Sequence, residues 1–157
     1  ISLIIEKNNF FISFLCSFAV NTSLISKSGE ECSVTLDLTA VDLFTGYVEF
    51  YKCGAQDCIV RKNKRIHYIN SPSLPLGIIK DADVSQGNGS LAEGDIIIMS
   101  TDGVREEDFY IIEREVKRFN NENIRAFTEG LGEKIREIQA ERNDDLTIVT
   151  LLLQKNE

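Results

Sequence analysis

The run Ile96–Ser100, with the sequence IIIMS, constrains the fold more than any other stretch of this 157-residue chain. Four large apolar side chains in succession leave a strand without a polar face, so both of its sides must be covered. Neighbouring strands and helices have to provide that cover, and a chain of this length is large enough to supply them within one domain. We therefore predict a single domain over residues 1–157, with a buried strand at Ile96–Ser100.

The residues before this run alternate between apolar and polar with a period of two, which indicates further strands. Val34–Leu43 is predicted to be a half-buried strand that forms a hairpin with Tyr47–Gly54. Cys58–Lys62 and Arg65–Ile69 are predicted to form a second, shorter hairpin. Two prolines make residues 70–78 a rigid, extended loop, and a weak edge strand is expected after it.

The apolar period becomes helical after Gly103. Apolar residues fall three or four apart through residues 109–119 and again through residues 124–138, which predicts two helices. The chain then closes with a strongly apolar strand at Leu146–Leu153. Residues 1–20 are predicted to form one or two apolar helices, followed by a loop. This order of helix, antiparallel strands, two helices and closing strand is typical of an α+β domain.

The N-terminal segment Phe10–Val20, FFISFLCSFAV, has the length of a signal-peptide core but is too short to span a bilayer. The flank before it carries Glu6, Asn8 and Asn9 and is not a basic region, and no small-residue cleavage site follows cleanly. A helix covered by protein is therefore favoured over a targeting signal.

The formal net charge of −8 argues against general binding of nucleic acid or acidic membranes, because both require clustered lysine and arginine. The four cysteines form no CxxC pair and the single histidine has no ligand at metal spacing, which disfavours a zinc site. Cys16, Cys32 and Cys53 have apolar neighbours and are expected to be buried free thiols in a reducing cytoplasm.

Two acidic signals lie at the ends of predicted strands. Asp102-Gly103 follows the C-terminal end of Ile96–Ser100, and Asn143-Asp144-Asp145 precedes the closing strand. If these strands are antiparallel neighbours, both acidic segments lie at the same edge of the sheet, where carboxylate oxygens could hold Mg²⁺ or Mn²⁺. The alternative is that both are ordinary turns, since Asp-Gly and Asn-Asp are common turn sequences.

Other polar residues have weaker claims to a chemical role. His67 lies on a predicted hairpin outside every motif, and Ser100 has no histidine to activate it. Thr101 and Thr147 are expected to orient the carboxylates through hydrogen bonds. The charged stretch at residues 105–108 is most simply a solvated helix start, although its position next to Asp102 would also suit contact with a substrate.

The order of several motifs resembles a known family. LAEGDIIIMSTDGV, followed after two helices by NDDLTIVTLLL, resembles the C-terminal part of the metal-dependent (type 2C) serine/threonine protein phosphatases. The similarity is greatest to the branch that contains bacterial stage II sporulation protein E, and it extends upstream through TLDLTAVDLFTGYVEFYKCG and SLPLGII. It covers about residues 21–153. The resemblance implies part of an α/β/β/α sandwich, in which helices flank two antiparallel sheets and the family's first strands are missing.

The resemblance also implies the chemistry of the site. Two Mn²⁺ or Mg²⁺ ions would activate water for attack on a phosphoserine or phosphothreonine, and no other cofactor is expected. Asp102 and Asp144 match the family's catalytic metal ligands, and Asp145 takes the following position as a third candidate ligand. The family's earlier metal-binding Asp-Gly segment has no match before the first predicted helix, so the two-metal site would be incomplete and this chain alone inactive.

The substrate implied by the resemblance is a phosphorylated regulatory protein, such as an anti-sigma-factor antagonist in sporulation. Residues 1–20 would serve as a regulatory or interface helix, with a homodimer formed through it. The expected location is the cytoplasm, and the resemblance leaves membrane attachment open only through segments outside this chain. The alternative function is a truncated or degenerate phosphatase-like module that binds proteins without catalysis.

Overall fold

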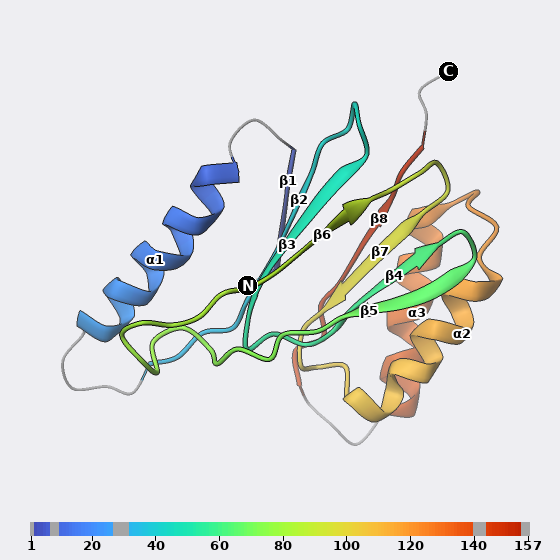
Figure 1. Ribbon diagram of the computed structural model, residues 1–157. Helices are drawn as coiled ribbons and strands as arrows, with labels where there is room; N and C mark the ends of the chain where they lie inside the picture. Colours follow the sequence, from blue (N-terminus) through green and yellow to red (C-terminus); the bar gives the residue numbers. More distant parts are fainter. Residues whose placement is uncertain (1, 7–9, 27–31, 140–143, 155–157) are drawn as a thin grey trace. The chain divides into compact units, whose positions relative to one another are not determined.

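The computed structural model describes residues 2–6, 10–26, 32–139 and 144–154 of the chain (Figure 1). The chain divides into two compact units. The first unit consists of Ile1–Ala55 with Asn70–Ser90, and the second consists of Gln56–Ile69 with Leu91–Glu157. The single domain expected over residues 1–157 stays a prediction. No helix among the described residues is long and apolar enough to cross a membrane.

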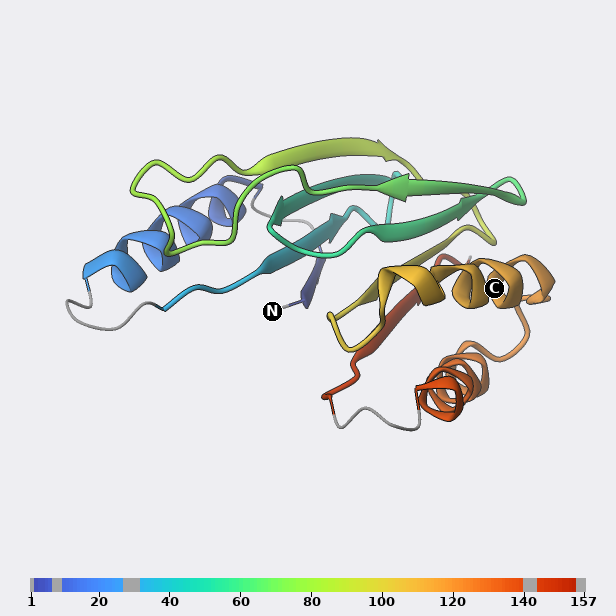
Figure 2. The same ribbon diagram turned by 90° about the horizontal axis from the view of Figure 1, so that it is seen from below.

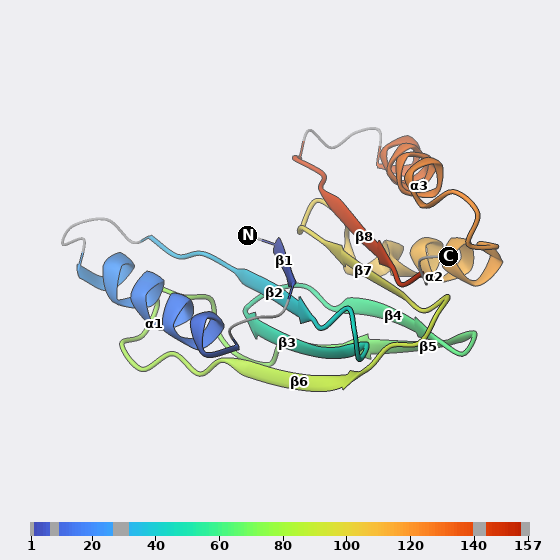
Figure 3. The same cartoon turned by 90° about the horizontal axis from the view of Figure 1, so that it is seen from above.

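The first unit contains a four-stranded sheet in the order β1-β2-β3-β6, with β3 between β2 and β6 (Figure 3). Both pairings of β3 are antiparallel, whereas β1 runs parallel to β2. A helix, α1, contacts β2. The bounds are β1 Ser2–Glu6, α1 Phe10–Ser26, β2 Leu36–Val41, β3 Tyr47–Cys53 and β6 Ser85–Ser90.

The prediction of helices throughout residues 1–20 is wrong for Ser2–Glu6, which forms the strand β1. This segment contains two adjacent isoleucines, whose β-branched side chains favour strands, and its backbone pairs with β2. The helix expected over Phe10–Val20 is confirmed, but it continues into the predicted loop as far as Ser26. In that last turn the hydroxyl of Ser26 donates to the carbonyl of Thr22 at 2.7 Å.

The prediction that β2 is half-buried is also wrong, because its polar residues Asp37 and Thr39 are as buried as Leu38. Asp37 lies directly opposite Lys52 on β3, and the Nζ of Lys52 is 2.6 Å from its carboxylate. A buried carboxylate is costly unless a cation accompanies it, and Lys52 supplies that cation. Asp37 in the alternating pattern of β2 therefore marks a buried ion pair, and not a face exposed to water.

The second unit contains a wholly antiparallel sheet in the order β5-β4-β7-β8. Helix α2 contacts β4 and β5, and helix α3 contacts β8 (Figure 2). A short 3₁₀ helix, η1, leads into α2. The bounds are β4 Cys58–Lys62, β5 Arg65–Ile69, β7 Ile96–Ser100, η1 Glu106–Asp108, α2 Phe109–Arg118, α3 Ile124–Ile138 and β8 Ile148–Leu152.

The core of the second unit lies between its sheet and its two helices. Ile96 and Ile98 of β7 belong to one cluster with Val116 of α2 and Leu131 of α3. The alternate residues of β7, Ile97 and Met99, are fully buried as well. The predicted burial of this strand on both faces is thus confirmed.

Arg61 on β4 connects the end of α2 to the sheet of the second unit. Its guanidinium donates to the carbonyls of Val116 and Phe119 at the end of α2, at 2.7 and 2.8 Å. It also donates to the carbonyl of Gly94 at 3.0 Å and to the side chain of Asn121. The last carbonyls of a helix lack partners within the helix, so Arg61 satisfies groups that burial would otherwise leave unpaired.

The cysteines follow the prediction in part. Cys53 is fully buried, and burial raises the pKa of its thiol, which keeps it protonated. Cys32 is exposed, so its predicted burial is wrong. Its backbone carbonyl lies against Gly77, and the contact is made by the main chain while the side chain remains in solvent. The surroundings of Cys16 fall outside the described side chains.

Candidate metal site

The pairing of β7 with β8 brings the two acidic segments to one edge of the sheet. The strands are antiparallel neighbours, and their last registered pair is Ser100 with Ile148. One residue further on, the backbone N–H of Thr101 donates to the carbonyl of Thr147 at 3.1 Å. The predicted adjacency is confirmed, and Asp102 therefore follows β7 at the edge where Asp144 and Asp145 precede β8.

Gly103 places the two segments in backbone contact. A Cβ added to Gly103 would lie 2.3 Å from the carbonyl oxygen of Asp145 and 2.9 Å from the Cα of Leu146, which is too close for any side chain. Gly103 is also buried. A glycine is required here because the acidic segment before β8 occupies the space of a side chain.

The three aspartate side chains are exposed at this edge. One carboxylate oxygen of Asp144 accepts a hydrogen bond from the backbone N–H of Asp145 at 3.0 Å. Within the described residues, no three Asp, Glu, His or Cys side chains are grouped closely enough to hold a metal ion. Asn143, named with this segment, lies outside the described residues. The assignment of Asp102, Asp144 and Asp145 as ligands therefore stays a prediction.

The donor chemistry of the segment nevertheless fits a hard divalent cation. Carboxylate oxygens at an exposed edge, with water in the remaining positions, are the usual surroundings of Mg²⁺. The contact at Gly103 holds the two acidic segments together without any side chain between them. The described residues thus fit one side of a Mn²⁺ or Mg²⁺ site.

The hydroxyl of Thr101 contacts the backbone of the acidic segment, so its predicted role of orienting the carboxylates stays a prediction. It accepts from the backbone N–H of Thr147 at 3.0 Å and lies 3.3 Å from the carbonyl of Asp145. These contacts hold the backbone of the acidic segment, whereas the prediction had the threonines orienting the carboxylates themselves. His67 is exposed on β5, at the opposite edge of the sheet from β8, as expected of a residue outside the site.

The charged stretch after Gly103 is only partly solvated, because Asp108 is buried. Arg105 donates to the Asp108 carboxylate at 2.7 Å, and Gln139 at the end of α3 donates to it at 2.8 Å. The hydrogen bond from Arg105, followed by that from Gln139, lowers the pKa of Asp108. Arg105, Glu106 and Glu107 line an open hollow of about 510 Å³. The sequence signal for the ion pair of Arg105 and Asp108 was an Arg and an Asp three residues apart.

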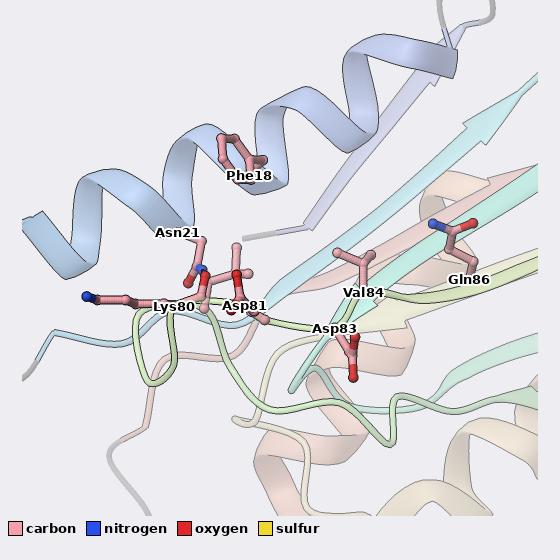
Figure 4. A pocket seen from close by; sticks show the side chains of 9 residues that line it. Phe18, Asn21, Lys80, Asp81, Asp83, Val84 and Gln86 are labelled. Carbon is pink, nitrogen blue, oxygen red and sulfur yellow. The ribbon is translucent and has the colours of Figure 1, made fainter.

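The first unit has a pocket of about 360 Å³ beside α1 (Figure 4). Asn21, a buried side chain that the sequence reasoning missed, fixes α1 to the loop that lines it. Its amide nitrogen donates to the carbonyls of Ile79 and Lys80 at 3.1 and 2.8 Å, and its oxygen accepts from the N–H of Gly77 at 2.7 Å. The pocket is lined by Phe18, Asn21, Leu76, Lys80, Asp81, Ala82, Asp83, Val84 and Gln86.

Comparison with known proteins gives one consistent family. The family model for stage II sporulation protein E (SpoIIE) matches residues 18–154. Stage II sporulation protein E of Bacillus subtilis (strain 168) is 26% identical over 144 residues, which are 87% of this chain and 17% of that protein. The same protein of Priestia megaterium is 27% identical over 145 residues, which are 88% of this chain and 25% of that protein. The chain thus spans a quarter or less of these relatives.

A solved structure shows the same fold. The phosphatase domain of SpoIIE from Bacillus subtilis, presoaked with manganese, aligns with a TM-score of 0.68 and 24% identity, over 96% of this chain and 75% of that one. Two sheets with flanking helices, antiparallel apart from the β1–β2 pair, are the arrangement expected from the sequence. Because the family model covers most of the chain, the chain belongs to the SpoIIE family of PP2C-type phosphatase domains.

Proposed function

We propose that the chain is part of a Mn²⁺- or Mg²⁺-dependent phosphoprotein phosphatase acting on phosphoserine or phosphothreonine. The observation that carries the proposal is the backbone contact between Gly103 and Asp145, which holds two acidic segments together at one sheet edge. Membership of the SpoIIE family supports the same reaction class.

The residues have distinct roles in this proposal. Asp102 and Asp144 would hold a divalent cation, and Asp145 would contribute less directly. Bound cations would supply an activated water and offset the negative charge of the phosphoryl group. Gly103 keeps the loop close to the segment before β8, and the exposure of the aspartates leaves the site open to a protein substrate.

The proposed substrate is a phosphorylated regulatory protein, such as an anti-sigma-factor antagonist in sporulation. The relatives' name, stage II sporulation protein E, supports a role in sporulation. The proposal also includes a cytoplasmic location and a homodimer formed through α1, on which Phe18 is exposed.

A second candidate is a phosphatase-like module that binds proteins without catalysis. The observation in its favour is that the described residues contain no group of three metal-ligating side chains. The two candidates differ in whether the acidic edge binds a divalent cation.

The test measures hydrolysis of a phosphate ester with excess Mn²⁺, in the 157-residue chain and in the protein at its full natural length. We expect little turnover by the chain alone and chelator-sensitive turnover by the longer protein. In the longer protein, Asp102→Asn keeps the side chain's shape but removes a charge. Mn²⁺ affinity and turnover should fall severely, while thermal stability without metal stays the same or rises as carboxylate repulsion is relieved.

Asp144→Asn should behave like Asp102→Asn, and Asp145→Asn should be milder. Robust, chelator-sensitive turnover by the 157-residue chain would show that the remaining carboxylates suffice. If Asp102→Asn lowers thermal stability but leaves the Mn²⁺ dependence of turnover intact, Asp102 is a structural turn residue and the acidic edge is not the metal site.

A further inference from the structure

We propose that the side-chain hydroxyl of Thr101 replaces the Thr101 carbonyl in the β7–β8 ladder, and that this substitution positions the acidic turn for cation binding. The role for cations rests on the proposed function, whereas the substitution in the ladder is a feature of the backbone and can be tested separately.

The first step of the argument is the pairing of Thr101 with Thr147. Residues opposite each other in a hydrogen-bonded antiparallel pair exchange two bonds, each backbone N–H donating to the other's carbonyl. The Thr101 N–H makes its regular bond to the Thr147 carbonyl at 3.1 Å. The Thr147 N–H, in contrast, donates to the Thr101 hydroxyl at 3.0 Å. The side chain has taken the place of the carbonyl.

The second step concerns the hydrogen bond that the Thr101 carbonyl makes outside the ladder. The carbonyl of Thr101 accepts from the backbone N–H of Val104 at 3.0 Å. A bond from residue i to residue i+3 closes a β-turn, and Asp102 and Gly103 occupy its two central positions. The hydroxyl therefore lets one residue continue the ladder with its side chain and close the acidic turn with its backbone.

The third step links the turn to the opposite segment. The Thr101 hydroxyl, which accepts from Thr147, is also within 3.3 Å of the Asp145 carbonyl and can donate to it. That carbonyl is the group against which Gly103 packs. One network of hydrogen bonds around Thr101 thus connects two parts of the chain. These are the turn that contains Asp102 and the segment that contains Asp145. Serine could make the same bonds, and valine, of nearly the same shape, could make none of them.

The test compares Thr101→Val with Thr101→Ser in the protein at its full natural length. Thr147→Val is the matched control, because Thr147 takes part in the network through its backbone N–H and carbonyl and not, as first predicted, through an orienting side chain. Hydrogen exchange of the Val104 and Thr147 amides is measured without metal, and Mn²⁺ affinity by calorimetry. We expect Thr101→Val to speed exchange of both amides and to weaken Mn²⁺ binding about 10- to 100-fold. Thr101→Ser and Thr147→Val should resemble the unmodified protein.

Each outcome decides one part of the inference. Unchanged amide exchange in Thr101→Val would overturn the substitution in the ladder. Faster exchange with unchanged Mn²⁺ affinity would overturn the positioning role. An unmodified protein that binds no Mn²⁺ would overturn the proposed function and the positioning role together. The amide exchange rates would still show whether the Thr101 hydroxyl replaces the carbonyl in the ladder. Should Thr101→Val fail to fold by circular dichroism, Thr101→Ala provides the same comparison.

Discussion

Gly103 and Thr101 determine the position of the candidate ligands without being ligands themselves. Gly103 has no side chain because the Asp145 carbonyl occupies that space, and Thr101 bonds to the backbone on both sides of Leu146. Both effects act on the main chain. The carboxylates are consequently placed by backbone contacts that close the edge of the sheet.

The close approach at Gly103 predicts that Gly103→Ala is destabilising. The new methyl group would lie 2.3 Å from the Asp145 carbonyl, so one of the two segments must move. Overpacking of this kind typically costs about 1–3 kcal/mol of unfolding free energy. Urea unfolding of the metal-free protein measures the loss.

The matched control for this change is Gly130→Ala within α3, where an added Cβ meets no atom within 4 Å. Alanine is favoured over glycine inside a helix, so this variant should gain roughly 0.5–1 kcal/mol. Equal stability of Gly103→Ala and the unmodified protein would show that the acidic segment moves freely away from β7.

At the scale of elements, the sequence predicted the second unit well. The bounds of β4, β5 and β7 match the expected ranges Cys58–Lys62, Arg65–Ile69 and Ile96–Ser100. Their apolar patterns are short and bounded by turn residues, which limits the alternatives. The N-terminal segment was harder, because a short apolar run such as Leu3–Ile5 suits a strand and a buried helix equally. Pairing with β2, a contact distant in sequence, decides that Ser2–Glu6 is a strand.

The ion pair of Arg105 and Asp108 at the start of α2 predicts that the folded protein loses stability in acid. The pKa of Asp108 is lowered in the folded protein, chiefly by the hydrogen bond from Arg105. A lowered carboxyl pKa stabilises the folded state above the unfolded-state pKa, and this contribution disappears as the pH falls through the folded-state value. The urea midpoint should therefore fall as the pH decreases below about 4.

Asp108→Asn tests whether this carboxylate contributes to that loss. The variant should be less stable at neutral pH and should lose less stability on acidification, although Glu113 and Glu115, whose pKa values are also lowered, keep part of the effect. Glu106→Gln removes a charge from an exposed neighbour and should follow the unmodified protein. An Asp108→Asn curve parallel to the unmodified one would exclude this contribution.

At the scale of the whole molecule, the sequence predicted the family and the edge at which the acidic segments meet. The family was inferred from the resemblance of several motifs in the right order, and the shared edge from the antiparallel pairing of two recognisable strands. The replacement of the Thr101 carbonyl by the Thr101 hydroxyl in the ladder could not be predicted. The sequence around a threonine that follows a strand is the same whether its hydroxyl or its carbonyl completes the ladder. The buried pair of Asp37 and Lys52 was likewise hidden, since the two residues are 15 positions apart and lie on different strands.

The exposed apolar residues beside α1 predict self-association of the protein. Phe18 on α1 is 63% exposed, and Ile78 and Ile79, on the loop that Asn21 fixes to α1, are 52% and 44% exposed. Burying one large apolar side chain contributes about 1.5–3 kcal/mol, and a homodimer through this surface contains two copies of Phe18, so Phe18→Glu should weaken the dimer by roughly 100-fold or more. Sedimentation over a range of concentrations, with the protein at its full natural length, measures the change.

The matched control for Phe18 is Phe44, which is 98% exposed in the turn between β2 and β3. Phe44→Glu adds the same charge and removes the same apolar side chain, but its position is outside the α1 surface. A dimer through α1 should therefore tolerate Phe44→Glu and lose affinity with Phe18→Glu. Equal dissociation by both variants would indicate a general effect of charge, because the protein is already acidic at −8. An unmodified protein that stays monomeric at every concentration would rule out α1 as a homodimer interface.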